Sequence, residues 1–123
     1  PSFKTLKDRV SRASARGYLK GLDGRKLLVR SEHSALNTLL QGAGAITMKK
    51  ALVIFNRKLK AKELDARFVA NVHDEWQLEV REDQADEVGK LGVQSIREVT
   101  CAFELTCPLD GEYNVGNNWA ETH

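Results

Sequence analysis

The sequence predicts an α+β fold, in which helices pack against antiparallel hairpins. Apolar residues recur at helical spacing in three segments, whereas two other segments hold short apolar or alternating runs around turns. The helical and strand segments do not alternate one by one, as they would in a parallel βαβ fold. The chain has 123 residues and shows no repeat, linker or low-complexity segment, so a single domain, residues 1–123, is predicted.

The N-terminal segment is predicted to form a helix followed by a hairpin. In residues 1–16, apolar positions at helical spacing are surrounded by lysine and arginine, which indicates a basic amphipathic helix ending at Gly17. In residues 17–31, two short strands flank Asp23-Gly24, a dipeptide typical of tight hairpin turns.

A long helix is predicted over residues 32–61, beginning after Ser31, because an apolar residue returns every three or four positions. Gly42 and Gly44 interrupt this pattern, and each destabilises a helix by roughly 1 kcal/mol relative to alanine. Glycine at these positions therefore predicts a bend or the close approach of another group.

Residues 66–82 contain the stretch VHDEWQLEV and are predicted to form a second hairpin. His73, Asp74 and Glu75 fall at or near its turn, without the Asn-Gly or Asp-Gly pair that favours such turns. Carboxylates at turns are common as solvated residues, and that interpretation stays open for the tripeptide taken alone. A carboxylate presented to a cleft is also the kind of ligand that Mg²⁺ takes, together with phosphate oxygens and water.

Residues 83–123 are predicted to form a final helix and an irregular tail. Asp83 is predicted to cap the helix, whose buried stripe is predicted to run from Ala85 to Ala102. Trp76 and Trp119 lie in apolar local patterns, so both are predicted to be core residues.

Charge is distributed very unevenly along the chain. Residues 1–62 contain 15 Lys/Arg and 3 Asp/Glu, whereas residues 63–123 contain 4 Lys/Arg and 14 Asp/Glu. This asymmetry suggests a basic face for a polyanion, although solvated helix faces explain it about equally well. Two cysteines are too few for a disulfide framework, which favours a reducing, cytoplasmic compartment, and no apolar run is long enough to span a bilayer.

Three blocks of the sequence resemble the family A DNA polymerases, the bacterial polymerase I group and its phage relatives. VHDE after an apolar strand resembles the third sequence motif of that family. GYLKGLDGRKLLVRSEHSALNTLLQGAGA resembles the hairpin and long helix that follow the fingers, and GNNWAETH resembles the closing segment, down to His123. The blocks follow the family's order and spacing over residues 17–123, and residues 1–16 fit more loosely. The sequence of residues 31–41 is closer to the phage branch of the family.

The resemblance implies roles for the turn tripeptide. Asp74 matches the metal-binding aspartate of the palm, Glu75 matches its supporting acidic neighbour, and His73 matches a histidine beside the primer terminus. The implied cofactor is Mg²⁺, with two ions in the complete enzyme.

The resemblance also implies contacts with DNA. Asn37 and Gln41 match helix positions that contact the duplex near its growing end, where amides can monitor base-pair geometry from the minor groove. His33 occupies a place where many bacterial relatives have arginine, which puts its DNA contact in doubt. The expected phosphate contacts are Lys20, Arg25, Lys26 and Arg30.

The implied partners are a DNA primer-template, deoxynucleoside triphosphates and the N-terminal portion of the polymerase, with no membrane. That portion carries the fingers, the thumb and a palm strand with a second aspartate, none of which matches these 123 residues. The chain is therefore expected to be a cut piece or a split-gene subunit, and to be inactive alone. Two alternatives stay open: a non-catalytic DNA-binding module with the same fold, and, less favoured, a metal-dependent nuclease built around the tripeptide.

Overall fold

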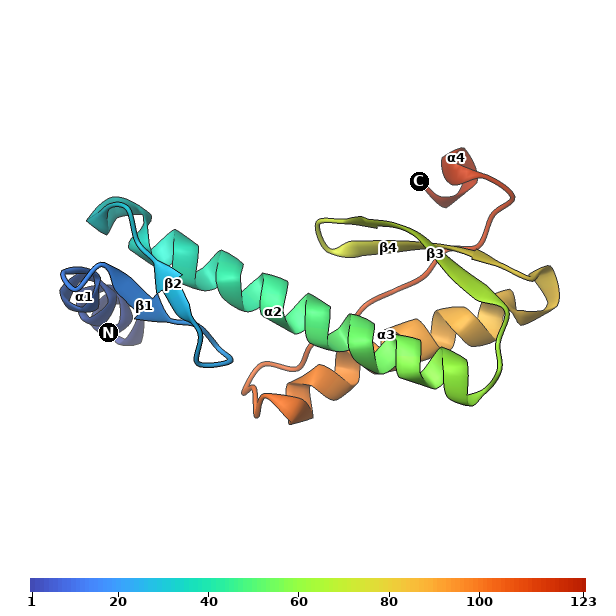
Figure 1. Cartoon of the computed structure of the whole chain (residues 1–123), viewed down its shortest axis with the longest axis horizontal. Helices are drawn as coiled ribbons and strands as arrows, with labels where there is room; N and C mark the ends of the chain where they lie inside the picture. The colour runs from blue at the N-terminus through green and yellow to red at the C-terminus, as the bar shows by residue number, and fades with distance from the viewer. The chain divides into compact units, whose positions relative to one another are not determined.

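The computed structural model describes residues 1–123, whose elements are shown in Figure 1. Helices and small antiparallel sheets make up the chain, which confirms the predicted α+β class. Backbone contacts gather into two compact units, Pro1–Thr47 and Met48–His123, where the sequence indicates one domain. Helix α2 (Glu32–Ala61) contributes to both units. None of the helices combines the length and the apolar character that crossing a membrane requires.

The first unit begins with helix α1 (Ser2–Ser14) and a small hairpin. Gly17, with φ of +82°, lies in the left-handed region that glycine tolerates, and it separates α1 from strand β1 (Tyr18–Lys20). Strand β1 pairs with β2 (Lys26–Leu28) across a turn in which Gly24 also has a positive φ, in agreement with the predicted Asp23-Gly24 turn.

The hydrophobic cluster of the first unit is small. It consists of the buried residues Val10, Leu19 and Ala35 with partly buried neighbours. Only the second half of α1 contributes to it, so Phe3 stays 65% exposed. The first half of the apolar stripe predicted for this helix, Phe3 and Leu6, is therefore exposed.

Helix α2 begins and ends at the predicted residues. The Ser31 hydroxyl accepts a hydrogen bond from the Ser34 amide at 3.3 Å, which satisfies one of the free donors at the helix start. The helix continues through both glycines. A Cβ atom on Gly42 would lie 3.0 Å from Leu27 Cδ1, so this glycine permits the predicted close approach, whereas a Cβ on Gly44 would meet nothing within 4 Å.

The second unit is built around the hairpin of strands β3 (Ala66–Val72) and β4 (Glu75–Val80). A register shift between Phe68 and Ala70 leaves Val69 as a bulge. The second half of α2 and helix α3 (Ala85–Ala102) supply the buried residues of the core. These are Phe55, Leu59, Val88 and Leu91.

Aromatic contacts tie the hairpin to this core. The Phe55 ring stacks on Trp76 at 5.5 Å and meets Phe68 edge-on at 5.6 Å, measured between ring centroids. Trp76 is partly buried and packs on the core, which confirms its predicted place. Trp119 is 58% exposed, so its predicted core position is wrong; it begins the short helix α4 (Trp119–Thr122), where it stacks on His123.

The start of α3 also differs from the prediction. A 3₁₀ turn (Glu82–Gln84) precedes the helix, whose N-cap is Gln84 without a side-chain cap. Asp83 does not cap the helix, because its carboxylate pairs with Arg81 at 2.6 Å. The buried stripe includes Val88, Leu91 and Val99, but Ala102 at the helix end is exposed.

Candidate active site

The turn between β3 and β4 consists of two residues, His73 and Asp74. Val72 pairs directly with Glu75, so the predicted tripeptide occupies the turn and the first residue of β4. His73 has φ of +51° and Asp74 has no positive φ, which is the sign pattern of a type II′ turn. This turn usually places glycine first, and a non-glycine residue there costs roughly 1–2 kcal/mol. Histidine in this conformation strains the backbone locally, and such strain is often found at functional sites.

Asp74 presents a free carboxylate at the tip of the hairpin. The residue is exposed and takes part in none of the ion pairs of the chain. No group of three or more His, Cys, Asp or Glu side chains gathers to hold a metal ion. The chain can therefore supply one carboxylate ligand to a Mg²⁺ ion whose other ligands are phosphate and water oxygens. It does not offer a complete set of protein ligands.

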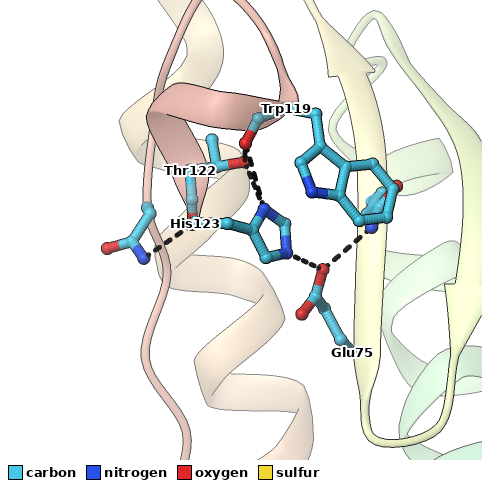
Figure 2. A network of polar contacts seen from close by, with 6 residues as sticks. Glu75, Trp119, Thr122 and His123 are labelled. Carbon is cyan, nitrogen blue, oxygen red and sulfur yellow. Dashed lines mark hydrogen bonds and ion pairs between the residues drawn. The ribbon is translucent and has the colours of Figure 1, made fainter.

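Glu75 has a different environment from its neighbour. Its Oε1 atom accepts a hydrogen bond from Gln77 Nε2 at 2.9 Å and lies 2.7 Å from His123 Nε2 (Figure 2). The Gln77 amide, followed by His123, lowers the pKa of the Glu75 carboxyl. The two adjacent carboxylates thus differ in their contacts: Glu75 is held by Gln77 and His123, whereas Asp74 forms no ion pair.

His123 approaches Glu75 from α4. Its Nδ1 atom lies 3.1 Å from the Trp119 carbonyl oxygen, and its ring stacks on Trp119 at 4.6 Å. The Trp119 carbonyl, followed by the Glu75 carboxylate, raises the pKa of His123. His123 ends the segment GNNWAETH, and nothing local in the sequence links residue 123 to residue 75, so this contact could not be predicted.

The predicted DNA-contacting residues of α2 share one face. His33, Asn37 and Gln41 follow at intervals of four residues, and all three are exposed. They belong to the first unit, whereas the turn tripeptide belongs to the second. The helix therefore presents these polar side chains to solvent, as an interface requires.

The predicted phosphate contacts are also exposed and lie on the first hairpin or directly after it. Lys20 and Lys26 are cross-strand partners, although like charges placed opposite each other destabilise a hairpin. Two cations lie over the Tyr18 ring: Lys26 Nζ is 4.7 Å and Arg16 Cζ is 4.9 Å from the ring centroid. Arg25 pairs with Asp23, and Arg30 is exposed beyond β2.

An apolar groove of about 510 Å³ runs between β3 and the second half of α2. Its lining includes Leu52, Val53, Phe68 and Val69. The sheet has two strands, so β3 has no strand partner on the side away from β4.

Comparison with known proteins places these features in one family. The model of DNA polymerase family A matches residues 5–121. A DNA-directed DNA polymerase of Escherichia phage Phieco32 is 33% identical over all of this chain, and that of Escherichia phage T7 is 42% identical over 88% of it. DNA polymerase I of Pseudomonas aeruginosa is 36% identical over 92% of the chain. The chain belongs to DNA polymerase family A.

The fold agrees with this assignment. The solved POL domain of Pol1 from M. smegmatis, in complex with DNA primer-template and dNTP, matches 89% of this chain with a TM-score of 0.70 and 24% identity. The chain corresponds to 20% of that structure, and to 21%, 16% and 13% of the three relatives named above. It therefore spans about a fifth or less of the proteins it matches.

Proposed function

We propose that this chain forms the C-terminal part of the palm of a DNA-directed DNA polymerase. The observation that carries the proposal is the family match across residues 5–121, which includes a hairpin whose turn presents the exposed Asp74 carboxylate. In this role the chain supplies one metal-binding carboxylate and part of the primer-template contact surface. The reaction is template-directed nucleotidyl transfer, in which the primer 3′ hydroxyl attacks the α-phosphate of a deoxynucleoside triphosphate and pyrophosphate leaves.

Asp74 would supply one carboxylate ligand to Mg²⁺. When bound, a pair of such ions lowers the pKa of the attacking hydroxyl and stabilises charge on the transferred phosphate. Glu75 supports the turn from the first position of β4, where Gln77 and His123 hold its carboxylate. His73, which forms the other half of the turn, would contact the primer terminus.

The first unit would bind the duplex. Asn37, Gln41 and His33 present donors and acceptors from one face of α2, and amides suit the minor-groove acceptors that every base pair offers. The exposed cations of the first hairpin would contact phosphates, which fixes the position of the duplex without reading its sequence. These cations are Lys20, Arg25, Lys26 and Arg30.

The isolated chain is expected to be inactive. A two-metal site needs more ligands than one exposed aspartate, and no group of three or more His, Cys, Asp or Glu side chains gathers in this chain to supply them. The same absence of clustered ligands counts against an independent nuclease. A non-catalytic DNA-binding module would keep the basic surface but would gain nothing from an exposed Asp74.

Manganese binding tests the assignment of Asp74. In the presence of primer-template DNA, Mn²⁺ should broaden the Asp74 amide signal in NMR spectra, and Asp74→Asn should abolish the effect. Glu79→Gln, an exposed acid on the same hairpin, is the matched control and should leave the broadening unchanged.

Primer extension separates a polymerase part from a non-catalytic module. The chain should add no labelled nucleotide alone, and should support extension when combined with the thumb, fingers and first palm strand of a phage relative. Asp74→Ala should abolish that extension. Extension that survives this change would contradict the catalytic assignment, and incorporation by the purified chain alone would contradict the expected inactivity.

A further inference from the structure

The tail after α3 is fastened to that helix at successive points. The Leu109 amide donates a hydrogen bond to Thr100 Oγ1 at 2.8 Å, and the Asp110 carboxylate pairs with Arg97 at 2.7 Å. Further along, the Tyr113 ring lies on Gly89 so closely that a Cβ there would come 2.5 Å from Tyr113 Cε2. The tail thus runs back along α3, as Figure 1 shows, and its path leads to α4 beside the β3–β4 hairpin.

The end of the tail is itself held in one conformation. Asn118 caps α4 by accepting a hydrogen bond from the Glu121 amide, and the Glu121 carboxylate accepts one from the Asn117 amide at 2.6 Å. Asn114 Nδ2 donates to the Thr122 carbonyl oxygen at 3.2 Å. These hydrogen bonds connect residues 114–123 to one another. They therefore fix the position from which His123 contacts the hairpin.

His123 is the residue of this segment that contacts the turn region. It meets Glu75 at 2.7 Å, directly after Asp74, while its ring lies against Trp119 (Figure 2). The core contacts β4 as far as Trp76, whereas the turn residues His73 and Asp74 are exposed. His123 therefore supplies a side-chain restraint at Glu75, between the core contact of Trp76 and the exposed turn.

We infer that residues 114–123 form a clasp on the β3–β4 hairpin, in which His123 is a positioning residue that holds Glu75 and thereby fixes the turn presenting Asp74. The inference rests on the proposed function for the role of Asp74, but not for the clasp itself. Turns held only by their own strands fray, and local opening moves a side chain by more than a metal site tolerates. The clasp restrains that opening from outside the hairpin.

A double-mutant cycle on the 123-residue chain tests the clasp. His123→Ala, Glu75→Ala and the double variant are compared by amide hydrogen exchange at Asp74 and Glu75. Each single variant should speed exchange roughly two- to fivefold, the range expected for an exposed ion pair, and the double variant should be no faster than either. Amides of the α3 core should keep their protection, which separates positioning from a general loss of stability. Arg81→Ala, which removes an ion pair after the far end of β4, is the control and should leave the turn unchanged.

Manganese broadening of the Asp74 signal gives an independent arm. If the clasp positions the carboxylate, His123→Ala should raise the Mn²⁺ concentration needed for half-broadening about as many fold as it speeds exchange. Additive effects in the cycle, or unchanged exchange in both single variants, would overturn the clasp. An absence of broadening in the unmodified chain would instead overturn the proposed role of Asp74, and the exchange cycle would still decide the clasp.

Discussion

At the scale of single residues, both ring nitrogens of His123 face oxygen atoms of other residues. Nδ1 faces the Trp119 carbonyl oxygen and Nε2 faces the Glu75 carboxylate, and both of these groups only accept hydrogen bonds. Protonation of the ring lets both nitrogens donate, so these two acceptors favour the charged form of His123. This geometry explains why the pKa of His123 is raised by the carbonyl and by the carboxylate.

The titration of His123 follows from this geometry. A histidine whose pKa is higher in the folded chain stabilises it below the unfolded value and loses that contribution as pH rises through the folded value. We expect an NMR midpoint above the ordinary value of about 6.5. Glu75→Gln should lower the midpoint only in part, because the Trp119 carbonyl remains. A midpoint at or below the ordinary value would show that His123 does not make both contacts in solution.

At the scale of elements, glycines decide which segments can approach one another. Gly89 on α3 receives the Tyr113 ring and lets the tail follow the helix. Gly44 on α2 has no neighbour in that space and is exposed. Glycine at position 89 therefore permits close packing of another segment, whereas glycine at position 44 serves no packing contact.

Alanine substitutions at these two glycines should change stability in opposite directions. Gly89→Ala forces the Tyr113 ring off the helix and should lower the free energy of unfolding by about 1–3 kcal/mol, as overpacking does. Gly44→Ala should raise it by up to about 1 kcal/mol, since alanine is the better helix former and meets nothing. Urea denaturation measures both. Equal effects of the two changes would mean that the tail does not pack on α3 in solution.

Elements with local signals could be predicted from the sequence, and those set by distant contacts could not. The bounds of α2 and the Asp23-Gly24 turn follow from periodicity and turn chemistry. The exposure of Trp119 and the pairing of Asp83 with Arg81 depend on what each side chain meets after folding.

The same distinction holds for the candidate site. The resemblance to the polymerase family identified the tripeptide and the polar residues of α2 as candidate site residues. In the structure these residues lie on a turn and on one helix face. The contact of His123 with Glu75 joins positions 48 apart, and no spacing rule reaches that far.

At the scale of the whole molecule, charge and function divide along the chain. The basic excess lies within residues 1–62 and the acidic excess within residues 63–123. The proposed phosphate contacts therefore lie in the basic part of the chain, and the proposed metal-binding carboxylate lies in the acidic part.

DNA binding should therefore be weak, sensitive to salt and confined to the basic part. Each phosphate contact that is lost should reduce the slope of log affinity against log salt by about 0.9. We expect replacement of Arg25, Lys26 and Arg30 by alanine to flatten the slope accordingly. Arg81→Ala and Arg97→Ala, in the acidic part, should leave it unchanged. Fluorescence anisotropy with a labelled primer-template measures the slope, and binding that is indifferent to salt would contradict the proposed interface.

The unpaired edge of strand β3 predicts that the chain self-associates. Strand β3 has no partner on its outer side, the adjoining groove is apolar, and Val69 at the bulge is 66% exposed. An unpaired edge beside an apolar surface is a template for another strand, so the chain should dimerise or aggregate as concentration rises. Sedimentation velocity over a hundredfold range of concentration should show a rising weight-average mass. Val69→Lys should suppress it by placing a charge at the edge, whereas Val115→Lys, at a valine that is 56% exposed in the tail, should not. A strict monomer with slow amide exchange along the outer edge of β3 would show that the hairpin needs no further strand.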